Sequence, residues 1–328
     1  MDHIAYPGLN VPFEEQISAF VDETEGHLSS WARGSGMIAD EQNGVRFDSM
    51  LLGRLAARTY PMADQRSLFT LADWMGWFFL FDDTLDDTSE GRDIRYVRPI
   101  VRALDRILHQ DPIRLEFEGD SPVSLALADL WRRTARSMPA SWRKRFVRNM
   151  SAYLYAYVTQ AEVNTSRRAL TEESYVLHRL RSGAGFASID LIEFAQNASL
   201  PDDLHQRPEL QTLKETTSNV VCWSNDVFSA PKEITRGDLC NYVAVLQQQT
   251  QLPFQQCANM VCERILDQVR LFEDTEALLA RTKSRNTWGP STTRALGGYV
   301  KGLKAWMRGN IDWSLETARY RHRAIGSL

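Results

Sequence analysis

The pattern of apolar and polar residues along the chain predicts a protein built from α-helices. Five long stretches have helical length, and their apolar residues recur at helical spacing. These stretches are residues 67–83, 124–138, 142–164, 253–282 and 291–320. The sequence shows no convincing alternation of apolar and polar residues, which is the pattern of half-buried strands. Only short breaks separate the helical stretches, so we expect an all-α fold with many helices in a single domain, residues 1–328.

The stretch from 78 to 87, FFLFDDTLDD, runs from apolar residues directly into carboxylates. In a helix, residues four apart form stripes, and two neighbouring stripes here are apolar at one end and acidic at the other. The first stripe contains Trp74, Phe78, Asp82 and Asp86, and the second contains Phe79, Asp83 and Asp87. Carboxylates at the C-terminal end of a helix oppose its dipole and repel one another, so a cation is needed beside them. Mg²⁺ is the natural candidate, because it binds one or two carboxylates together with phosphate and water oxygens. The alternative is a helix that ends in an acidic, solvated loop.

A second polar cluster lies at 225–233, with the sequence NDVFSAPKE. Asn225, Ser229 and Glu233 are spaced four and four, which places three oxygen ligands of a hard cation on one helix face. Lys232 adds an ammonium beside this face, suited to phosphate. Pro231 predicts that the helix distorts or ends there, because proline removes a backbone hydrogen bond. Taken alone, this cluster is also compatible with an ordinary polar helix end. Taken together, the two clusters predict several Mg²⁺ ions on either side of an apolar cavity.

Composition and charge exclude several classes of partner. The net charge is −4 and the pI about 5.9, which does not favour nucleic acid or an anionic membrane surface. The longest apolar run has eight residues, far short of the ~20 that a membrane-spanning helix needs, and no signal peptide is visible. We therefore expect a cytoplasmic protein. The cysteines lack the spacing of a zinc site and are predicted to be buried thiols. They are Cys222, Cys240, Cys257 and Cys262.

The two clusters resemble the motifs of the class I terpene synthases, particularly the single-domain cyclases of bacteria and fungi. The aspartate-rich motif of that family is matched by Asp82, Asp83 and Asp86. Its second motif, N(D/N)xx(S/T)xxK(E/D), is matched by Asn225, Asp226, Ser229, Lys232 and Glu233. The stretch 237–246 is similar to the continuation of that motif, and Arg319 and Tyr320 match an Arg-Tyr pair near the C-terminus. The resemblance covers residues ~70 to 320 and implies an α-helical bundle with a central active-site cavity.

The resemblance also implies an arginine that senses diphosphate, followed by a linker residue and an effector glycine. Arg179, Ser182 and Gly183 match these positions, because Arg179 lies 46 residues before Asn225. The competing alignment uses Arg181, Ala184 and Gly185.

The roles implied by the resemblance are those of a metal-dependent cyclase acting on an isoprenyl diphosphate. Three Mg²⁺ ions are implied, with Mn²⁺ as a substitute. Two would be held by Asp82, Asp83 and Asp86, and one by Asn225, Ser229 and Glu233. The diphosphate would be bound by Arg179, Lys232, Arg319 and Tyr320. The expected aromatic wall, which would stabilise carbocations, is Phe78, Phe79, Trp306 and Trp313; each of these is alternatively an ordinary core residue.

The expected substrate is the fifteen-carbon farnesyl diphosphate, with the twenty-carbon geranylgeranyl diphosphate as the alternative. A side-by-side homodimer is implied by the resemblance only. Two other functions remain as alternatives. A chain-elongating prenyltransferase would use a second aspartate-rich motif, which residues 225–233 do not form. A non-catalytic helical protein would use its acidic helix to bind Ca²⁺ or a basic partner.

Overall fold

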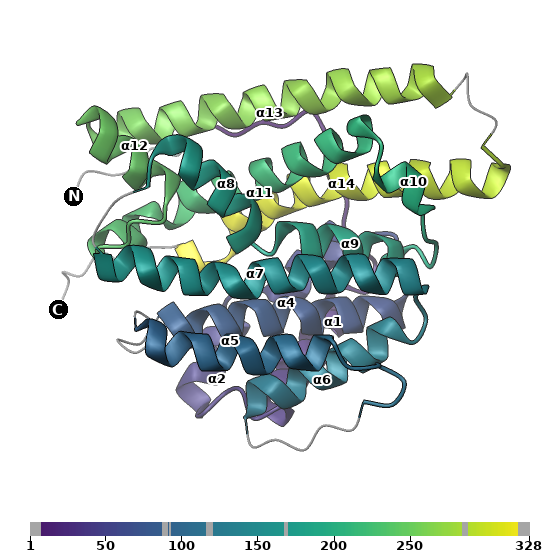
Figure 1. Cartoon of the computed structure of the whole chain (residues 1–328), viewed down its shortest axis with the longest axis horizontal. Helices are drawn as coiled ribbons and strands as arrows, with labels where there is room; N and C mark the ends of the chain where they lie inside the picture. The colour runs from purple at the N-terminus through teal and green to yellow at the C-terminus, as the bar shows by residue number, and fades with distance from the viewer. Residues whose placement is uncertain are drawn as a thin grey trace.

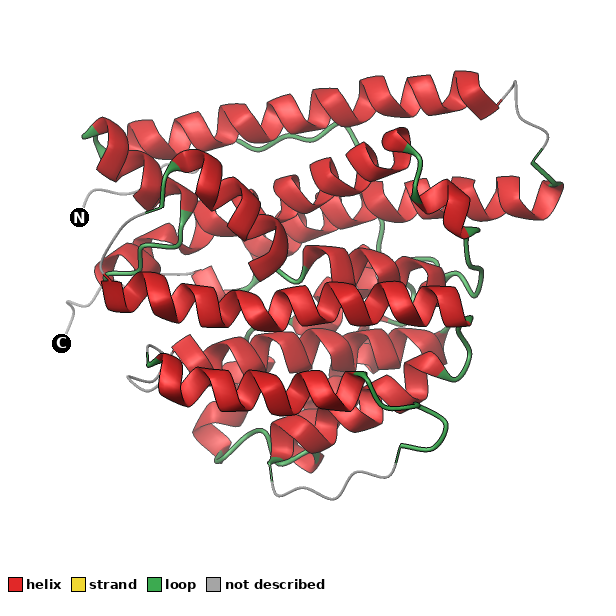
Figure 2. Ribbon diagram, in the orientation of Figure 1, coloured by secondary structure: helices red, strands yellow, loops and turns green. Residues whose placement is uncertain are grey.

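The structure is a computed structural model in which most of the chain is described. The described residues are 8–86, 91, 93–115, 121–166, 170–283 and 288–320, without the side chains of 86, 282 and 283. These residues form helices joined by loops, and they contain no strand (Figure 2). The predicted all-α class is confirmed.

The helices lie along the chain as follows. The first half contains α1 (Val21–Gly34), α2 (Glu41–Asp48), α3 (Leu52–Thr59), α4 (Gln65–Asp86), α5 (Ile94–Leu108), α6 (Pro122–Ala135) and α7 (Ala140–Ser166). The second half contains α8 (Glu172–Ser182), α9 (Gly185–Ala195), α10 (Asp202–His205), α11 (Pro208–Thr235), α12 (Tyr242–Thr250), α13 (Phe254–Lys283), α14 (Pro290–Glu316) and a 3₁₀ turn, η2 (Ala318–Tyr320). The five predicted stretches correspond to α4, α6, α7, α13 and α14.

The helices form a bundle in which α11 is central. In Figure 1, α13 and α14 lie along one side of the molecule and α5 and α6 along the other, with α4 and α7 between them. Helix α11 packs against α8, α9, α12, α13 and α14, and α9 also packs against α4 and α7. The helices that carry the two predicted clusters, α4 and α11, are thus connected through α9. In the part of the chain that the structure describes, no helix is both long and apolar enough to span a bilayer.

Helix α11 does not end at Pro231, so the predicted end of the helix at this proline is wrong. It continues to Thr235, whose hydroxyl donates to the carbonyl of Pro231 at 2.7 Å. Asn241, in the loop before α12, donates to Glu233 at 2.8 Å and holds the end of the helix. Phe228 and Ala230 are buried just before the proline. These tertiary contacts outweigh the local cost of proline, which is roughly 3 kcal/mol.

The apolar residues form one core cluster that extends from Val11 to Tyr320. Its densest aromatic part lies on the inner face of α4, where Trp74 packs on Phe146 of α7 with ring centroids 5.3 Å apart. Three cysteines are buried as predicted, and all four are free thiols, but Cys240 is only partly buried. Many of the aromatic residues therefore pack in the core, and a subset of them lines the cavity described next.

Candidate active site

A central cavity of about 130 Å³ lies between α4, α7, the α8–α9 junction, α11, α14 and η2. It brings together most of the residues that the sequence predicted. These are Phe78, Phe79, Asp82, Arg179, Ser182, Gly183, Asn225, Ser229, Lys232, Glu233, Trp306, Arg319 and Tyr320. Residues as far apart in the chain as Phe78 and Tyr320 thus meet in one space, as the resemblance implied.

Two predicted residues, Trp313 and Asp83, do not line the cavity, and two others fall outside the described part of the chain. Trp313 is only 1% exposed and packs behind the cavity, against Phe79 and Tyr320, so it does not form the wall. Asp83 lies beside the cavity, where it pairs with Arg319 at 3.0 Å. The side chain of Asp86 and the whole of Asp87 are outside the described residues.

The acidic end of α4 is closed by Arg319 of η2. Its guanidinium lies 3.0 Å from Asp83 and 3.4 Å from Asp82, and it stacks over the ring of Phe79 at 4.9 Å. Partial burial raises the pKa of Asp82, and Arg319 opposes this rise. The negative charges of Asp83 and Glu233 raise the pKa of Asp82 further. Asp82 and Glu233 therefore face the same space from different helices, which is how carboxylates approach when they share cations.

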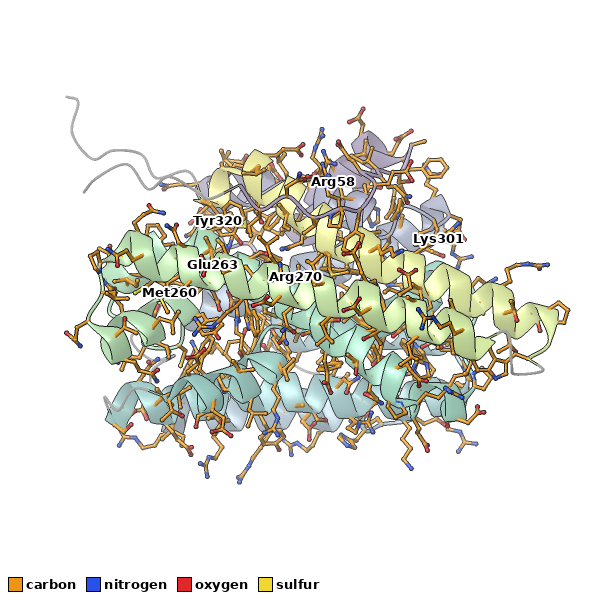
Figure 3. All side chains as sticks on the ribbon, turned by 90° about the horizontal axis from the view of Figure 1, so that it is seen from above. Arg58, Met260, Glu263, Arg270, Lys301 and Tyr320 are labelled. Atoms are coloured by element: carbon orange, nitrogen blue, oxygen red, sulfur yellow. The ribbon has the colours of Figure 1, made fainter. Side chains whose placement is uncertain are left out.

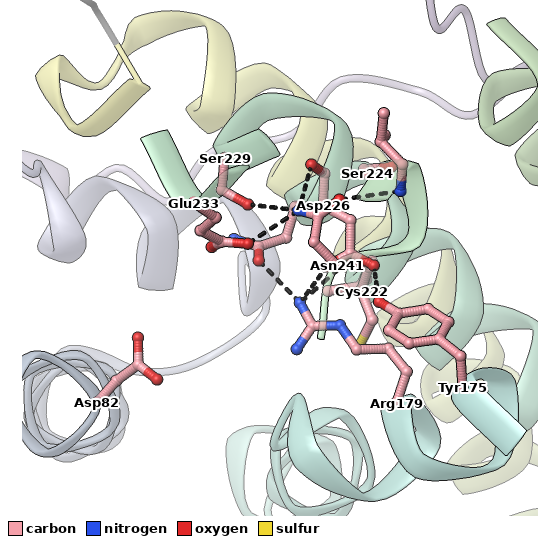
Figure 4. A network of polar contacts seen from close by, with 12 residues as sticks. Asp82, Tyr175, Arg179, Cys222, Ser224, Asp226, Ser229, Glu233 and Asn241 are labelled. Atoms are coloured by element: carbon pink, nitrogen blue, oxygen red, sulfur yellow. Dashed lines mark hydrogen bonds and ion pairs between the residues drawn. The ribbon is translucent and has the colours of Figure 1, made fainter. Parts of the chain in front are cut away.

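The second cluster lies on one face of α11, as the spacing predicted, because Asn225, Ser229 and Glu233 all line the cavity. Figure 4 shows Ser229 and Glu233 of this face beside Asn241. The amide oxygen of Asn225 accepts from Arg179 at 2.8 Å, and its amide nitrogen donates to the Tyr320 hydroxyl at 2.6 Å. The amide of Asn241 donates to Glu233 at 2.8 Å and to the Ser229 hydroxyl at 3.5 Å. The oxygens of this face are thus oriented by neighbours from α8, η2 and the loop before α12.

Asp226, the second residue of the motif, has a different environment from its neighbours. It is 1% exposed, it pairs with Arg179 at 2.8 Å, and it accepts a short hydrogen bond from Tyr175. Burial raises its pKa to about 7, against the lowering effect of Arg179, and the charge of Glu233 raises it further. Asp226 does not line the cavity, so it positions Arg179 from behind.

The break between α8 and α9 decides which arginine reaches the cavity. Helix α8 ends at Ser182, and Ala184 has left-handed backbone angles (φ 54°), so the chain turns before α9 begins. A Cβ on Gly183 would overlap the sulfur of Cys222 on α11, so only glycine permits this close approach. Arg179 on the last turn of α8 points to α11, whereas Arg181 is exposed at the surface.

The sequence did not assign several residues of the cavity lining to the site, and two of them are linked by hydrogen bonds to the acidic cluster of α4. Tyr157 of α7 donates to Asp82 at 2.9 Å, and the hydroxyl of Tyr153 lies 2.9 Å from that of Tyr157. Their spacing of four within a predicted helix shows that they share a face. The sequence does not show which helix face the bundle turns inward, so this signal alone could not place them in the cavity.

The donor atoms fit a hard divalent cation. Asp82 on α4 faces Asn225, Ser229 and Glu233 on α11, and all four present oxygen ligands, which Mg²⁺ prefers. Among the described His, Cys, Asp and Glu side chains, no group of three forms a metal site by itself. The α11 face includes an amide and a hydroxyl, so its ligand set is not restricted to those four residue types.

Comparison with known proteins identifies the family. The family model "Terpene synthase family 2, C-terminal metal binding" matches residues 73–270, which span both oxygen-ligand clusters. The chain is 34% identical over 323 residues to (+)-T-muurolol synthase of Roseiflexus castenholzii, covering 98% of this chain and 95% of that protein. This chain belongs to the terpene synthase family. The synthase is also 27% identical over 323 residues to germacrene A synthase of Nostoc punctiforme, covering 98% of this chain and 97% of that protein.

Solved structures agree with this assignment. Wild-type cucumene synthase superposes with a TM-score of 0.82 at 25% identity, covering 94% of this chain and 100% of that one. Germacradien-4-ol synthase from Streptomyces citricolor superposes with a TM-score of 0.84 at 24% identity, covering 95% of this chain and 99% of that one, which supports the fold. The matched family is defined by metal binding, so the synthase depends on a divalent metal.

Proposed function

We propose that this synthase is a Mg²⁺-dependent sesquiterpene cyclase that converts farnesyl diphosphate into a cyclic sesquiterpene and diphosphate. The observation that carries the proposal is the composition of the cavity, in which an aromatic wall meets two oxygen-ligand clusters and three cationic side chains. The printed names of two relatives, (+)-T-muurolol synthase and 4-epi-cubebol synthase, state that those enzymes cyclise farnesyl diphosphate. This supports the fifteen-carbon substrate over the twenty-carbon alternative.

The metal ligands in this proposal are those expected from the sequence. Two Mg²⁺ ions would be held by the α4 cluster, and a third by the α11 face. The ligands are Asp82, Asp83 and Asp86 on α4, and Asn225, Ser229 and Glu233 on α11. When bound, the ions would supply positive charge to the diphosphate and make it a better leaving group.

The cationic residues of the cavity are arranged to bind the diphosphate. Arg179, Lys232 and Arg319 line the same space as the metal ligands, and Tyr320 adds a hydroxyl. The Nε of Arg179 is buried and has no hydrogen-bond partner among the described residues, so it can donate to an oxyanion. Arg179 is the sensor in this proposal, because Arg181 is exposed and outside the cavity.

The apolar wall would hold the isoprenyl chain and exclude water from the carbocations. Phe78, Phe79 and Trp306 line the cavity, and the face of an aromatic ring can stabilise a desolvated cation by about 2 kcal/mol. Trp313 would be a positioning residue, since it packs against both Phe79 and Tyr320 without reaching the cavity.

Substrate entry requires the cavity to open. Its volume of about 130 Å³ is smaller than the roughly 300–1,000 Å³ of most small-molecule sites. The contact between Arg319 and the aspartates of α4 closes the acidic side. Metal ions bound at these carboxylates would replace the guanidinium as their counter-charge. Arg319 would then be available to the diphosphate.

A product assay tests the function directly. The purified enzyme is incubated with ten-, fifteen- and twenty-carbon diphosphates, with Mg²⁺ or with EDTA, and the organic extract is analysed by gas chromatography–mass spectrometry. We expect a cyclic fifteen-carbon product from farnesyl diphosphate with Mg²⁺ only. A cyclic product from the twenty-carbon substrate alone would overturn the substrate assignment.

Two further arms of this assay separate the other functions. Longer linear diphosphates formed with added isopentenyl diphosphate would indicate a prenyltransferase. No conversion of any substrate would favour the helical binding protein. The homodimer stays a prediction, which light scattering during gel filtration tests.

A further inference from the structure

A second cavity of about 840 Å³ lies near the other end of α11. It is formed by the C-terminal end of α5, α6, the N-terminal half of α7, α10 and the first turns of α11, and it shares no lining residue with the active-site cavity. Lys214, the more buried of its two lining residues on α11, is eleven positions before Asn225, or about 16 Å along the helix. The terpene cyclisation proposed above does not use this cavity.

The described lining of this cavity is strongly cationic. Its five basic residues are Arg143, Lys144, Arg145, Arg148 and Lys214, and its one acidic residue is Asp202, which gives a net formal charge of +4. The whole chain has a formal net charge of −4, so the charge of the cavity lining is opposite in sign to that of the protein. A cavity lined by one sign of charge concentrates counter-ions of the opposite sign.

Within the described chain, only Arg145 among these basic residues is paired with carboxylates. Arg145 lies 2.8 Å from Asp190 of α9 and also pairs with Glu193 behind the cavity. The side chains of Lys144, Arg148 and Lys214 form no hydrogen bond or ion pair with the rest of the described chain. Lys144 and Arg148 are exposed and lie at the mouth, one turn apart on α7.

Lys214 is the exceptional residue of this group, because it is only 4% exposed. A buried ammonium without a partner is costly, and proteins rarely contain one. Burial lowers the pKa of Lys214 to about 8; Asp190 opposes this lowering, and the guanidiniums of Arg145 and Arg148 add to it. The arrangement is unfavourable for an empty cavity and favourable for one that contains an anion.

We propose that this second cavity binds a small phosphate-type anion, with Lys214 at its base and Arg148 and Lys144 at its mouth. Phosphate oxygens accept several charge-assisted hydrogen bonds at once, and these donors come from two helices, α7 and α11, that both line the cavity. The chemistry is shared by inorganic phosphate and inorganic diphosphate. This site is independent of the cyclase activity, because its residues do not reach the active-site cavity.

Isothermal titration calorimetry of the full-length protein tests the proposal. Sodium phosphate and sodium diphosphate are titrated separately at pH 7, in EDTA, so that metal-dependent binding at the active site is suppressed. Lys214→Met keeps a side chain of similar length and removes its charge, and Arg148→Gln removes the charge of an exposed residue on α7. We expect each substitution to weaken binding of at least one of the two anions by tenfold or more.

Two matched controls locate the binding. Lys301 is an exposed lysine on α14, labelled in Figure 3, and Lys301→Met should leave the affinity unchanged. Arg319→Gln removes a cation of the active site and should also leave this affinity unchanged. The proposal is wrong if neither anion binds, or if Lys214→Met and Arg148→Gln both bind as the wild type does. It is also wrong if only Arg319→Gln abolishes binding, because the anion would then occupy the active site.

Discussion

At the scale of single residues, this synthase contains two largely buried cationic side chains in positions that do not stabilise the fold. Arg179 is held between Asn225 and Asp226 and keeps one buried donor without a partner among the described residues. Lys214 is buried with no pairing carboxylate in the described chain. Both arrangements cost stability and both place a cation in a cavity, which is the expected compromise at a binding site.

The sensor role of Arg179 can be tested against Arg181, two residues away on the same helix. Arg179→Ala should lower turnover by about a hundredfold or more, because it removes a donor aimed at the site of developing negative charge. Arg181→Ala should leave turnover within about twofold, because that side chain is exposed and outside the cavity. Steady-state kinetics with farnesyl diphosphate decide between them, and the opposite order would restore the competing alignment.

Substitution of Lys214 should make the protein more stable near neutral pH. The pKa of Lys214 is lowered to about 8 in the folded state, against about 10.4 when unfolded. The unfolded chain therefore binds more protons between these values, and the free energy of unfolding of the wild type rises with pH across that window. Asp190, Glu193, Arg145 and Arg148 are the charged groups whose effects on Lys214 are resolved.

Lys214→Met removes this penalty, so its free energy of unfolding at pH 7 should exceed that of the wild type by up to about 3 kcal/mol. The difference should shrink towards pH 10. Urea unfolding at several pH values measures both effects, with Lys301→Met as the control. A variant that is less stable at pH 7 would show that the ammonium has a partner that stabilises it.

At the scale of helices, the sequence predicted five of the long helices, but it predicted only the part of α11 around the second cluster and did not predict α5. It also did not show which face of each helix turns towards the cavity. The periodic stretches became α4, α6, α7, α13 and α14, and the spacing of four on α11 correctly placed Asn225, Ser229 and Glu233 on one face, towards the cavity. Pro231 did not end α11, because contacts from Asn241 and the core hold the helix beyond it. Local patterns define a helix face, whereas the rotation of that face towards cavity or core depends on long-range packing.

The sequence was likewise only partly able to predict which aromatic residues face the cavity. Phe78, Phe79 and Trp306 reach the cavity as predicted, but Trp313 packs behind it, and Tyr153 and Tyr157 take a place that the sequence did not assign. A helix with apolar residues around most of its surface gives no local signal for the side that faces a cavity.

The break between α8 and α9 offers a test at this scale. Gly183→Ala should lower the free energy of unfolding by about 1–3 kcal/mol, because the new methyl group would overlap the sulfur of Cys222. It should also lower turnover, because it displaces the turn that follows Arg179. Gly297→Ala on α14 is the matched control: nothing lies within 4 Å of its Cβ position, and alanine should stabilise that helix by up to about 1 kcal/mol. Equal stability of the two variants in urea unfolding would show that the close approach is not required.

At the scale of the whole molecule, one apolar cluster connects the N-terminal and C-terminal parts of the chain. It includes Val11, near the start of the described chain, and Tyr320, at its end. We propose on this basis that residues 1–328 are a single domain. In that domain α11 is shared by two cavities, with the motif of the active site near its C-terminal end and Lys214 near its N-terminal end. The molecule would then bind anions at both ends of one helix, with metal needed at only one of them.

This arrangement predicts two distinguishable effects of diphosphate on thermal unfolding. A ligand that binds only the folded state stabilises it, by about 2.7 kcal/mol at 100 times its dissociation constant. With Mg²⁺, diphosphate should raise the unfolding temperature of the wild type and of Lys214→Met, but less in Asp82→Ala, because that variant loses a proposed metal ligand. In EDTA, the smaller remaining shift should be kept by Asp82→Ala and lost by Lys214→Met. Differential scanning fluorimetry measures the shift for the wild type and both variants in each of the two conditions. Loss of both shifts in Asp82→Ala would mean that the active site binds all of the diphosphate, and the same Mg²⁺-dependent shift in Asp82→Ala as in the wild type would contradict the metal assignment.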